Sequence, residues 1–248
     1  MMNIEVVENK IFAGVVSDEI VASINDAISD HGECKIALAG GKTPSVVYRA
    51  IARPPRVGEV DWAKVKIFWG DERFVPQTDV QSNFNMAQEA FLSFLAKISP
   101  KYFAVDTSLA SASESAKAYE QVLRREFAAN EGQMPIFDLV LLGVGEDGHT
   151  ASIFPQAEIL KGDWQHSAEI CIASRCPYDD TDRVSLSPAA IINARRIIYI
   201  VRGEGKRSVL NKVINGEANI LDLPAQLYRE CQGKVTFFVD SAAAESLS

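Results

Sequence analysis

Residues 137–152 read FDLVLLGVGEDGHTAS, and this stretch decides the fold class. It joins the most strand-like run of the chain, apolar except for Asp138, to a loop rich in glycine and polar residues. A strand that is apolar along its whole length is typical of a sheet covered on both faces. The stretch therefore predicts a buried strand followed directly by a loop that can carry chemistry.

The same pattern recurs along the chain, where short apolar runs alternate with segments whose apolar residues are three and four apart. We expect strands at 34–39, 65–69, 137–142, 168–173, 183–186, 197–201 and 235–239, and helices at 44–52, 83–95, 113–129 and 206–214. This alternation predicts an α/β fold, with a mostly parallel, Rossmann-like sheet and helices on both faces. Ligands bind at the carboxyl ends of the strands in such sheets, so the loops that follow strands are the candidate site loops.

Length and charge exclude several classes of protein. The 248 residues, 47% hydrophobic and 23% charged, suit one domain over residues 1–248. The formal net charge of −8 argues against nucleic-acid or anionic-membrane binding, because both need a basic face. A small anionic ligand needs only a local positive pocket. No apolar run approaches the roughly 18 residues that span a bilayer, and residues 1–10 show no signal-peptide stretch.

The cysteines favour a cytoplasmic location. Cys34, Cys171, Cys176 and Cys231 form no C-x-x-C pair, and no histidine lies at zinc-finger spacing. We therefore expect reduced structural thiols and no metal site.

The loop AGGKTP at 39–44 is the first of three loops with chemical content. Gly40 and Gly41 precede the hydroxyl of Thr43 and a helix start, which gives a concave row of backbone N–H groups suited to phosphate. The Gly-Lys-Thr run resembles the end of a Walker A loop, but that motif requires glycine where this chain has Ile36. A plain strand-to-helix turn that needs glycines is the alternative.

The second loop follows the next strand and carries two acids and an arginine, Asp71, Glu72 and Arg73. These charges are costly to bury unless they are paired. The planar guanidinium of Arg73 suits a forked contact with an oxyanion, and a surface ion pair is the alternative. We expect Ser82 or Asn83 to cap the helix that follows.

The third loop follows the strand at 137–142 and holds Asp147 and His149. Its three glycines fit G-x-G-x-x-G, but a dinucleotide site needs a long helix after the third glycine and an acid beyond the next strand. Pro155 interrupts any such helix, and the nearest acids precede the next strand. An imidazole on this loop can accept a proton from water at neutral pH, and a purely structural histidine is the alternative.

A weaker fourth feature is RGEGKR at 202–207, after the strand at 197–201. It places Lys206 at a helix start, where a cation does not stabilise the helix. A phosphate partner explains this placement, and a solvated helix charge is the alternative.

Four segments occur together and in order: LAGGKTP, DERFVP with the later Ser-Asn pair, residues 137–155 and the GEGK run. In these the chain resembles the 6-phosphogluconolactonases, which share a family with glucosamine-6-phosphate isomerases. The string GEDGHTAS at 145–152 is the most specific part. The resemblance implies the NagB/RpiA-type α/β fold, shared by glucosamine-6-phosphate deaminases and ribose-5-phosphate isomerases. It also implies hydrolysis of 6-phospho-D-glucono-1,5-lactone to 6-phospho-D-gluconate in the oxidative pentose phosphate pathway, without metal or cofactor.

The resemblance also implies roles for individual residues. His149 is expected to take a proton from the water that attacks the lactone carbonyl, and Asp147 to orient the loop or the imidazole. Substrate and phosphate are expected to contact Gly40, Gly41, Lys42, Thr43, Asp71, Arg73, Asn83, Gly145 and Lys206. The loop is not a G-x-S-x-G elbow, so no serine nucleophile is expected. The expected partner is a small sugar phosphate lactone, with no nucleic acid, membrane or obligatory protein partner.

The chain departs from the family pattern in the glycine loop, which usually reads Ser-Gly-Gly-Ser-Thr-Pro. Here Ala39 and Lys42 replace the two serines, so a hydroxyl contact is lost and a cation is gained. Deaminase activity is one alternative, but there the histidine works with a glutamate five residues later, where this chain has Phe154. The deaminases also have tyrosine at the position of Arg73. A non-catalytic sugar-phosphate sensor on the same fold is the other alternative.

Overall fold

The computed structural model describes residues 2–95, 100–130 and 132–247 and contains two sheets. The larger has the order β1 (Met2–Val7), β10 (Lys234–Asp240), β9 (Arg196–Val201), β6 (Leu139–Leu142), β2 (Cys34–Leu38), β3 (Val65–Trp69) and β5 (Lys101–Tyr102), and every neighbouring pair is parallel. The smaller has the order β4 (Asp71–Arg73), β8 (Asp182–Leu186) and β7 (Cys171–Arg175), and it is antiparallel.

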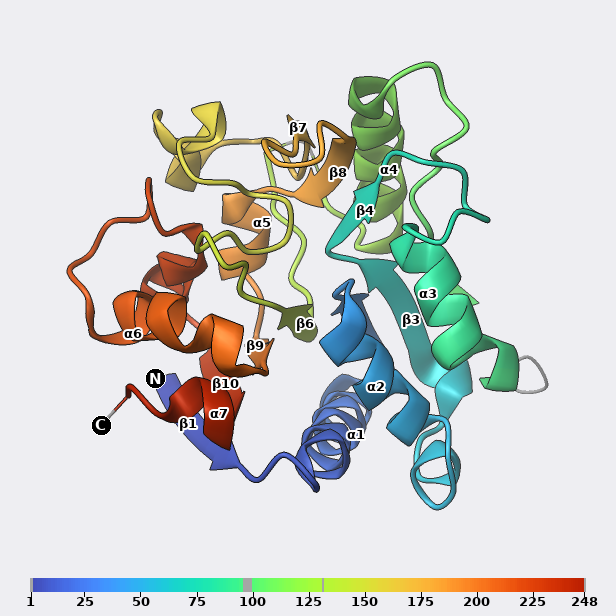
Figure 1. Cartoon of the computed structure of the whole chain (residues 1–248). Coiled ribbons are helices and arrows are strands. Elements are labelled where there is room, and N and C mark those ends of the chain that lie inside the picture. Colours follow the sequence, from blue (N-terminus) through green and yellow to red (C-terminus); the bar gives the residue numbers. More distant parts are fainter. Residues whose placement is uncertain (1, 96–99, 131, 248) are drawn as a thin grey trace.

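Helices cover both faces of the larger sheet (Figure 1). They are α1 (Phe12–His31), α2 (Lys42–Ile51), α3 (Asn83–Ala90), α4 (Ala112–Glu126), α5 (Pro188–Ile192), α6 (Arg207–Asn215) and α7 (Ser241–Ala244). In β6, Leu139 and Leu141 pack in one core cluster with α1, α2 and α3. Val140 and Leu142 pack in the other, with α4, α5 and α6. This confirms the predicted mostly parallel sheet and explains why its strands are apolar on both sides.

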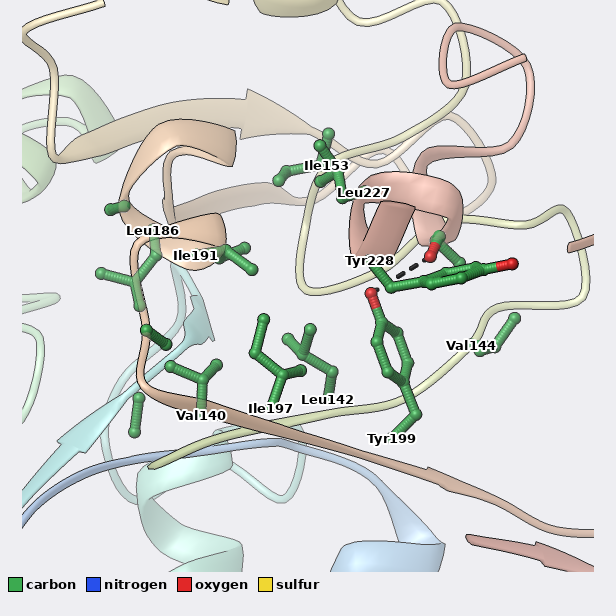
Figure 2. Packing of buried hydrophobic residues seen from close by; sticks show 14 of the residues in the cluster. Val140, Leu142, Val144, Ile153, Leu186, Ile191, Ile197, Tyr199, Leu227 and Tyr228 are labelled. Carbon is green, nitrogen blue, oxygen red and sulfur yellow. Dashed lines mark hydrogen bonds between the residues drawn. The ribbon is translucent and has the colours of Figure 1, made fainter. Parts of the chain in front are cut away.

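Figure 2 shows part of the cluster on the α5 side, where Val140, Leu142 and Ile197 point from the sheet toward Ile191. The Tyr199 hydroxyl donates a hydrogen bond of 3.1 Å to the carbonyl of Ala225. Full burial of one such aliphatic side chain stabilises the fold by about 1.5–3 kcal/mol, so this layer is a rigid support for the loops above it.

The strand order places a crevice between β2 and β6. From β2 the chain continues outward through β3 and β5, whereas from β6 it continues in the opposite direction through β9 and β10. Loops at the carboxyl ends of two such neighbouring strands diverge, and the space between them is where open α/β sheets bind ligands. The loop that follows β2 is the glycine loop, residues 39–43, and the loop that follows β6 is the histidine loop, residues 143–153, which holds His149.

The sequence prediction for residues 168–173 and 183–186 was wrong in one respect. They were expected in the parallel sheet, but they contribute to β7 and β8 of the antiparallel sheet. Only residues 176–181 connect these strands, and a parallel crossover needs about a dozen residues or more, so a hairpin forms instead. Residues 71–73, expected in a loop, form β4 and pair with β8.

Other boundaries differ by small amounts. The predicted helix at 83–95 divides, because α3 ends at Ala90 and a 3-10 turn over Leu92–Leu95 follows. Five strands and α-helices were missed by the sequence analysis, namely β1, β5, α1, α5 and α7. For α1 a signal exists, since its buried face repeats every four residues from Phe12 through Val16 to Ile20. Among the helices in the described ranges, none combines the length and the apolar character needed to cross a membrane.

Candidate active site

A pocket of about 770 Å³ lies at the crevice between β2 and β6. It is lined by all eleven residues that the sequence analysis expected in the site: Gly40, Gly41, Lys42, Thr43, Asp71, Arg73, Asn83, Gly145, Asp147, His149 and Lys206. They come from four separate segments of the chain, 40–43, 71–83, 145–149 and 206, so the fold brings together residues that are far apart in the sequence.

The histidine loop, residues 143–153, is held by the core on both sides of His149. Val144 and Ile153 are buried in the cluster of Figure 2, and the Thr150 hydroxyl donates 2.9 Å to the carbonyl of Gly143. Ala151 adopts a left-handed φ of 48°, which costs about 1 kcal/mol or more in a residue with a Cβ. The buried neighbours supply the packing that maintains this conformation.

The central feature of the loop is a histidine–aspartate pair. His149 Nδ1 lies 2.6 Å from Asp147 Oδ1, and the backbone N–H of His149 donates to the same oxygen at 3.1 Å. This contact assigns the ring proton to Nδ1 and leaves Nε2 as the basic nitrogen. Partial burial acts to raise the pKa of Asp147, but hydrogen bonds from His149 and Tyr178 and the charge of His149 lower it to about 2. Asp147 is therefore a carboxylate throughout the neutral range.

Gly145 is the residue that makes room for this pair. A Cβ at position 145 would lie 2.1 Å from Nδ1 of His149 and 2.5 Å from Oδ1 of Asp147, both closer than Cβ atoms come to other groups. The ring of Phe154 packs against the imidazole with 4.9 Å between centroids. Gly145 was expected to bind substrate, and its observed close contact is with the histidine–aspartate pair.

The glycine loop, residues 39–43, leads into the N-terminus of α2. Gly41 is the N-cap residue of α2 and has no side chain that could accept a hydrogen bond from the helix. The first backbone N–H groups of α2, which lie at the pocket, therefore have no capping oxygen. Gly40 packs against Asn83, and a Cβ at position 40 would lie 2.0 Å from its Oδ1. Lys42 is exposed at this helix end. Backbone donors, the helix dipole and a lysine together suit an anion.

Glu72 organises the segment 71–83 that carries Arg73, here called the arginine loop, from within the core; the sequence did not reveal this role. Its side chain is buried, Oε1 accepts from the N–H groups of Arg73 (2.8 Å) and Asn83 (2.6 Å), and Oε2 accepts from that of Phe84 (2.7 Å). Burial raises the pKa of Glu72, while these three N–H donors act to lower it. Ser82 caps α3 as predicted, accepting from Asn85 N–H at 3.2 Å.

Replacing Glu72 with glutamine is expected to destabilise the fold by about 2 kcal/mol. The side-chain NH2 group of glutamine would face a backbone N–H donor, and it cannot accept a hydrogen bond from that donor. The measurement is denaturant unfolding, with the m-value as a check on the two-state transition. Glu89→Gln is the matched control, because Glu89 is exposed on α3, the helix whose first two N–H groups donate to Glu72. Equal stability of the two variants would contradict the assigned role of Glu72.

Asp71 connects the arginine loop to the histidine loop. Its Oδ2 accepts from the Ser152 hydroxyl at 2.7 Å, and its backbone carbonyl accepts from Asn83 Nδ2 at 2.9 Å. Arg73 donates from Nη1 to the carbonyl of Gln81 at 2.7 Å, which orients the guanidinium at the pocket. These contacts fix the relative positions of the two loops.

Lys206 is the half-buried cation of the pocket, at the end of a 3-10 turn (Glu204–Lys206) that precedes α6. Burial lowers its pKa, and the carboxylates of Glu146 and Asp147 oppose this shift. With Lys42, Arg73 and Arg202 it brings four cations to one pocket of an acidic protein. In the ranges that the structure describes, no three or more His, Cys, Asp or Glu side chains are grouped to hold a metal ion.

Two further pocket residues were missed by sequence reasoning. Arg202 lines the pocket and donates from Nε to Asn9 Oδ1 at 2.7 Å. Its position directly after a strand is a signal that could have found it. Tyr178 lines the pocket from the hairpin that connects β7 and β8, and its hydroxyl donates to Asp147 Oδ2 at 2.8 Å. No local pattern marks Tyr178, because its partner is far away in the sequence.

A sequence profile described as glucosamine-6-phosphate isomerases/6-phosphogluconolactonase matches residues 8–237. The chain belongs to this family. The curated 6-phosphogluconolactonase of Synechocystis sp. is 34% identical over 229 residues, which covers 92% of this chain and 90% of the relative. That of Nostoc sp. is 35% identical over 231 residues, with 93% and 92% covered. The resemblance seen in the sequence motifs is confirmed over nearly the whole chain.

Solved structures of the family have the same fold. A 6-phosphogluconolactonase from Trypanosoma cruzi has a TM-score of 0.86 at 30% identity, with 100% of this chain and 97% of that chain covered. A monomeric glucosamine-6-phosphate deaminase of the NagB superfamily has a TM-score of 0.78 at 17% identity, with 99% and 100% covered, which shows the shared fold alone. The predicted fold type is thereby confirmed.

Proposed function

We propose that this chain hydrolyses 6-phospho-D-glucono-1,5-lactone to 6-phospho-D-gluconate in the oxidative pentose phosphate pathway, within one domain over residues 1–248. The observation that carries the proposal is the placement of the His149–Asp147 pair in the same pocket as the cations Lys42, Arg73 and Lys206. Relatives 34% and 35% identical to this chain are named 6-phosphogluconolactonase, which supports the same activity here.

In the proposed complex, the phosphate binds at the N-terminus of α2, over residues 40–43. Backbone N–H groups and the helix dipole favour the dianion, and Arg73 and Lys206 add charge-assisted hydrogen bonds. Because the phosphate is at the far end of the sugar from the lactone, this binding directs the carbonyl carbon toward His149. The Asp71–Ser152 contact maintains the spacing between the two ends.

His149 then acts as the general base. Its Nε2 takes a proton from water while the water oxygen bonds to the lactone carbonyl carbon. Backbone N–H groups of the pocket loops stabilise the oxyanion that forms. When the tetrahedral intermediate collapses, the bond between carbon and the ring oxygen breaks, and the imidazolium returns its proton to that oxygen. Asp147 stabilises the imidazolium between the two steps and keeps the proton of the neutral ring on Nδ1.

The residue that packs on the imidazole favours the lactonase over a deaminase. Phe154 occupies the position at which the deaminases carry the glutamate that works with their histidine. A phenyl ring has no ionisable proton. Ring opening and isomerisation would therefore lack a carboxyl group at this position to transfer protons. Ester hydrolysis needs only one base at this point.

The test is a lactonase assay of the purified protein with freshly prepared 6-phosphogluconolactone, with spontaneous hydrolysis subtracted. Glucosamine-6-phosphate is the parallel substrate. We expect hydrolysis of the lactone well above the spontaneous rate and no release of ammonia from the amino sugar. Binding of the lactone without turnover would indicate a sensor, and ammonia release would indicate a deaminase; either result would sink the proposal.

Replacing Arg73 with alanine is expected to raise KM about tenfold with kcat changed by less than about threefold, because a contact with the phosphate holds substrate and transition state alike. Initial rates over a range of lactone concentrations measure both constants. Arg125→Ala, an exposed arginine on α4, is the control for loss of a positive charge. An unchanged KM would remove Arg73 from the phosphate site.

The proposal includes a cytoplasmic location, with no nucleic acid, membrane or obligatory protein partner. Its support is the acidic net charge and the state of the thiols: Cys34, Cys171 and Cys176 are buried as free thiols. Burial also raises the pKa of Cys231 to about 12, so this thiol is not a nucleophile at neutral pH. Fractionation of cells that express the chain checks the location.

A further inference from the structure

Tyr178 is an exposed residue whose hydroxyl reaches the histidine–aspartate pair. It is 68% exposed, yet its hydroxyl donates a 2.8 Å hydrogen bond to Asp147 Oδ2 and its side chain lines the pocket. The two oxygens of Asp147 therefore have different partners. Oδ1 accepts from the ring and the backbone of His149, and Oδ2 accepts from Tyr178.

The hairpin that carries Tyr178 is built rigidly. The N–H of Cys176 donates to the carbonyl of Thr181 at 2.9 Å, which closes the turn. Asp179 accepts from the Thr181 hydroxyl at 2.6 Å and from Nη2 of Arg183, also at 2.6 Å. Arg183 is itself buried, so the residue that follows Tyr178 is anchored to the core of the small sheet. The backbone that carries Tyr178 is thus held in place by the fold, unlike that of a residue in an unsupported surface loop.

Near neutral pH both groups are in the protonation states that this hydrogen bond needs. Donation to Asp147 raises the pKa of Tyr178 to about 12, so the hydroxyl keeps its proton. The pKa of Asp147 is about 2, so the carboxylate keeps its acceptor oxygens. A carboxylate held at both oxygens cannot turn about its Cβ–Cγ bond, whereas one held at a single oxygen can.

We propose that Tyr178 is a positioning residue, which holds Asp147 so that Asp147 keeps the proton of neutral His149 on Nδ1. The inference rests on the proposed lactonase mechanism, in which Nε2 must be free to accept a proton from water. If Asp147 turns, the ring can hold its proton on Nε2 instead, and that tautomer cannot act as the base. Tyr178 lies in the turn between β7 and β8, so the small antiparallel sheet contributes a residue to the site at the carboxyl ends of the strands of the large one.

The test is Tyr178→Phe, which removes one oxygen from an exposed side chain. For the loss of one hydrogen bond to a charged group, we expect kcat to fall about five- to tenfold with KM within about twofold. In ¹⁵N spectra of histidine-labelled protein, the share of the Nδ1–H tautomer of His149 is expected to fall. The chain has three histidines, and His149→Gln assigns the signal. Tyr102→Phe is the control, a tyrosine 47% exposed on β5, and it should change neither quantity.

A double-mutant cycle with Asp147→Asn separates positioning from other roles. If Tyr178 acts through Asp147, adding Tyr178→Phe to Asp147→Asn should lower kcat by less than about twofold further. A wild-type tautomer share in Tyr178→Phe would overturn the inference, whether or not kcat falls. An additive cycle would overturn it as well. If the wild-type protein does not hydrolyse the lactone, the proposed function fails, and the tautomer measurement still decides the role of Tyr178.

Discussion

Replacing His149 with alanine is expected to lower kcat for lactone hydrolysis by about 100-fold or more, which corresponds to the usual contribution of a general base. His149 is held by Asp147 at 2.6 Å, so Nε2 remains the nitrogen that can accept the proton of water. The proposed phosphate contacts do not involve His149, so we expect KM to change much less than kcat.

The measurement is the initial rate at saturating lactone, after subtraction of spontaneous hydrolysis, which becomes a large fraction of the signal in a weak variant. His166→Ala is the matched control, because His166 also lies next to an aspartate, Asp163, but is exposed at the surface. We expect His166→Ala to keep wild-type kcat. A near-normal kcat in His149→Ala would remove His149 as the base.

Replacing Gly145 with alanine is expected to lower kcat by a similar factor, about 100-fold, although the new residue carries no reactive group. A Cβ at position 145 would lie 2.1 Å from Nδ1 and 2.3 Å from Cε1 of His149, so the ring and Asp147 must move apart or away from the pocket. Loss of orientation by about 1 Å at a catalytic group costs about 100-fold in rate.

Gly162→Ala is the control, because Gly162 is exposed outside the pocket and a Cβ there meets no atom within 4 Å. We expect kcat of Gly162→Ala to stay at the wild-type value and both variants to unfold at similar denaturant concentrations. Rates for Gly145→Ala equal to those of Gly162→Ala would show that the close packing around His149 has no catalytic consequence.

The local features of the fold were predictable because their causes are local. Apolar runs such as residues 197–201 form strands because every side chain there is buried, on one face of the sheet or the other. The glycines at 40 and 145 stand where Asn83 and His149 approach the backbone closely. The prediction that Ser82 or Asn83 caps a helix follows from the hydroxyl and amide chemistry of N-caps, and Ser82 does so.

What the sequence left undetermined depends on contacts between distant residues. The hairpin of β7 and β8 was assigned to the wrong sheet, since periodicity reports burial and says nothing about the partner of a strand. The sequence assigned Glu72 no role of its own and did not show whether its charged run is buried; Glu72 is buried and accepts from three N–H donors that only the packed segment provides. The contact of Tyr178 with Asp147 spans 31 positions and leaves no local pattern.

The amino-acid sequence by itself determined the class of fold, the family and the four loops that carry chemistry, because strand burial, turn residues and motif strings are encoded within short segments. Only the tertiary structure decided that these loops share one pocket. The strand order puts β2 beside β6 and β3 on the other side of β2, and the 2.7 Å hydrogen bond from Ser152 to Asp71 joins the loop after β6 to the segment after β3. Neighbours in a sheet are determined by the packing of the whole core, so the positions of four cations around one histidine are a property of the fold.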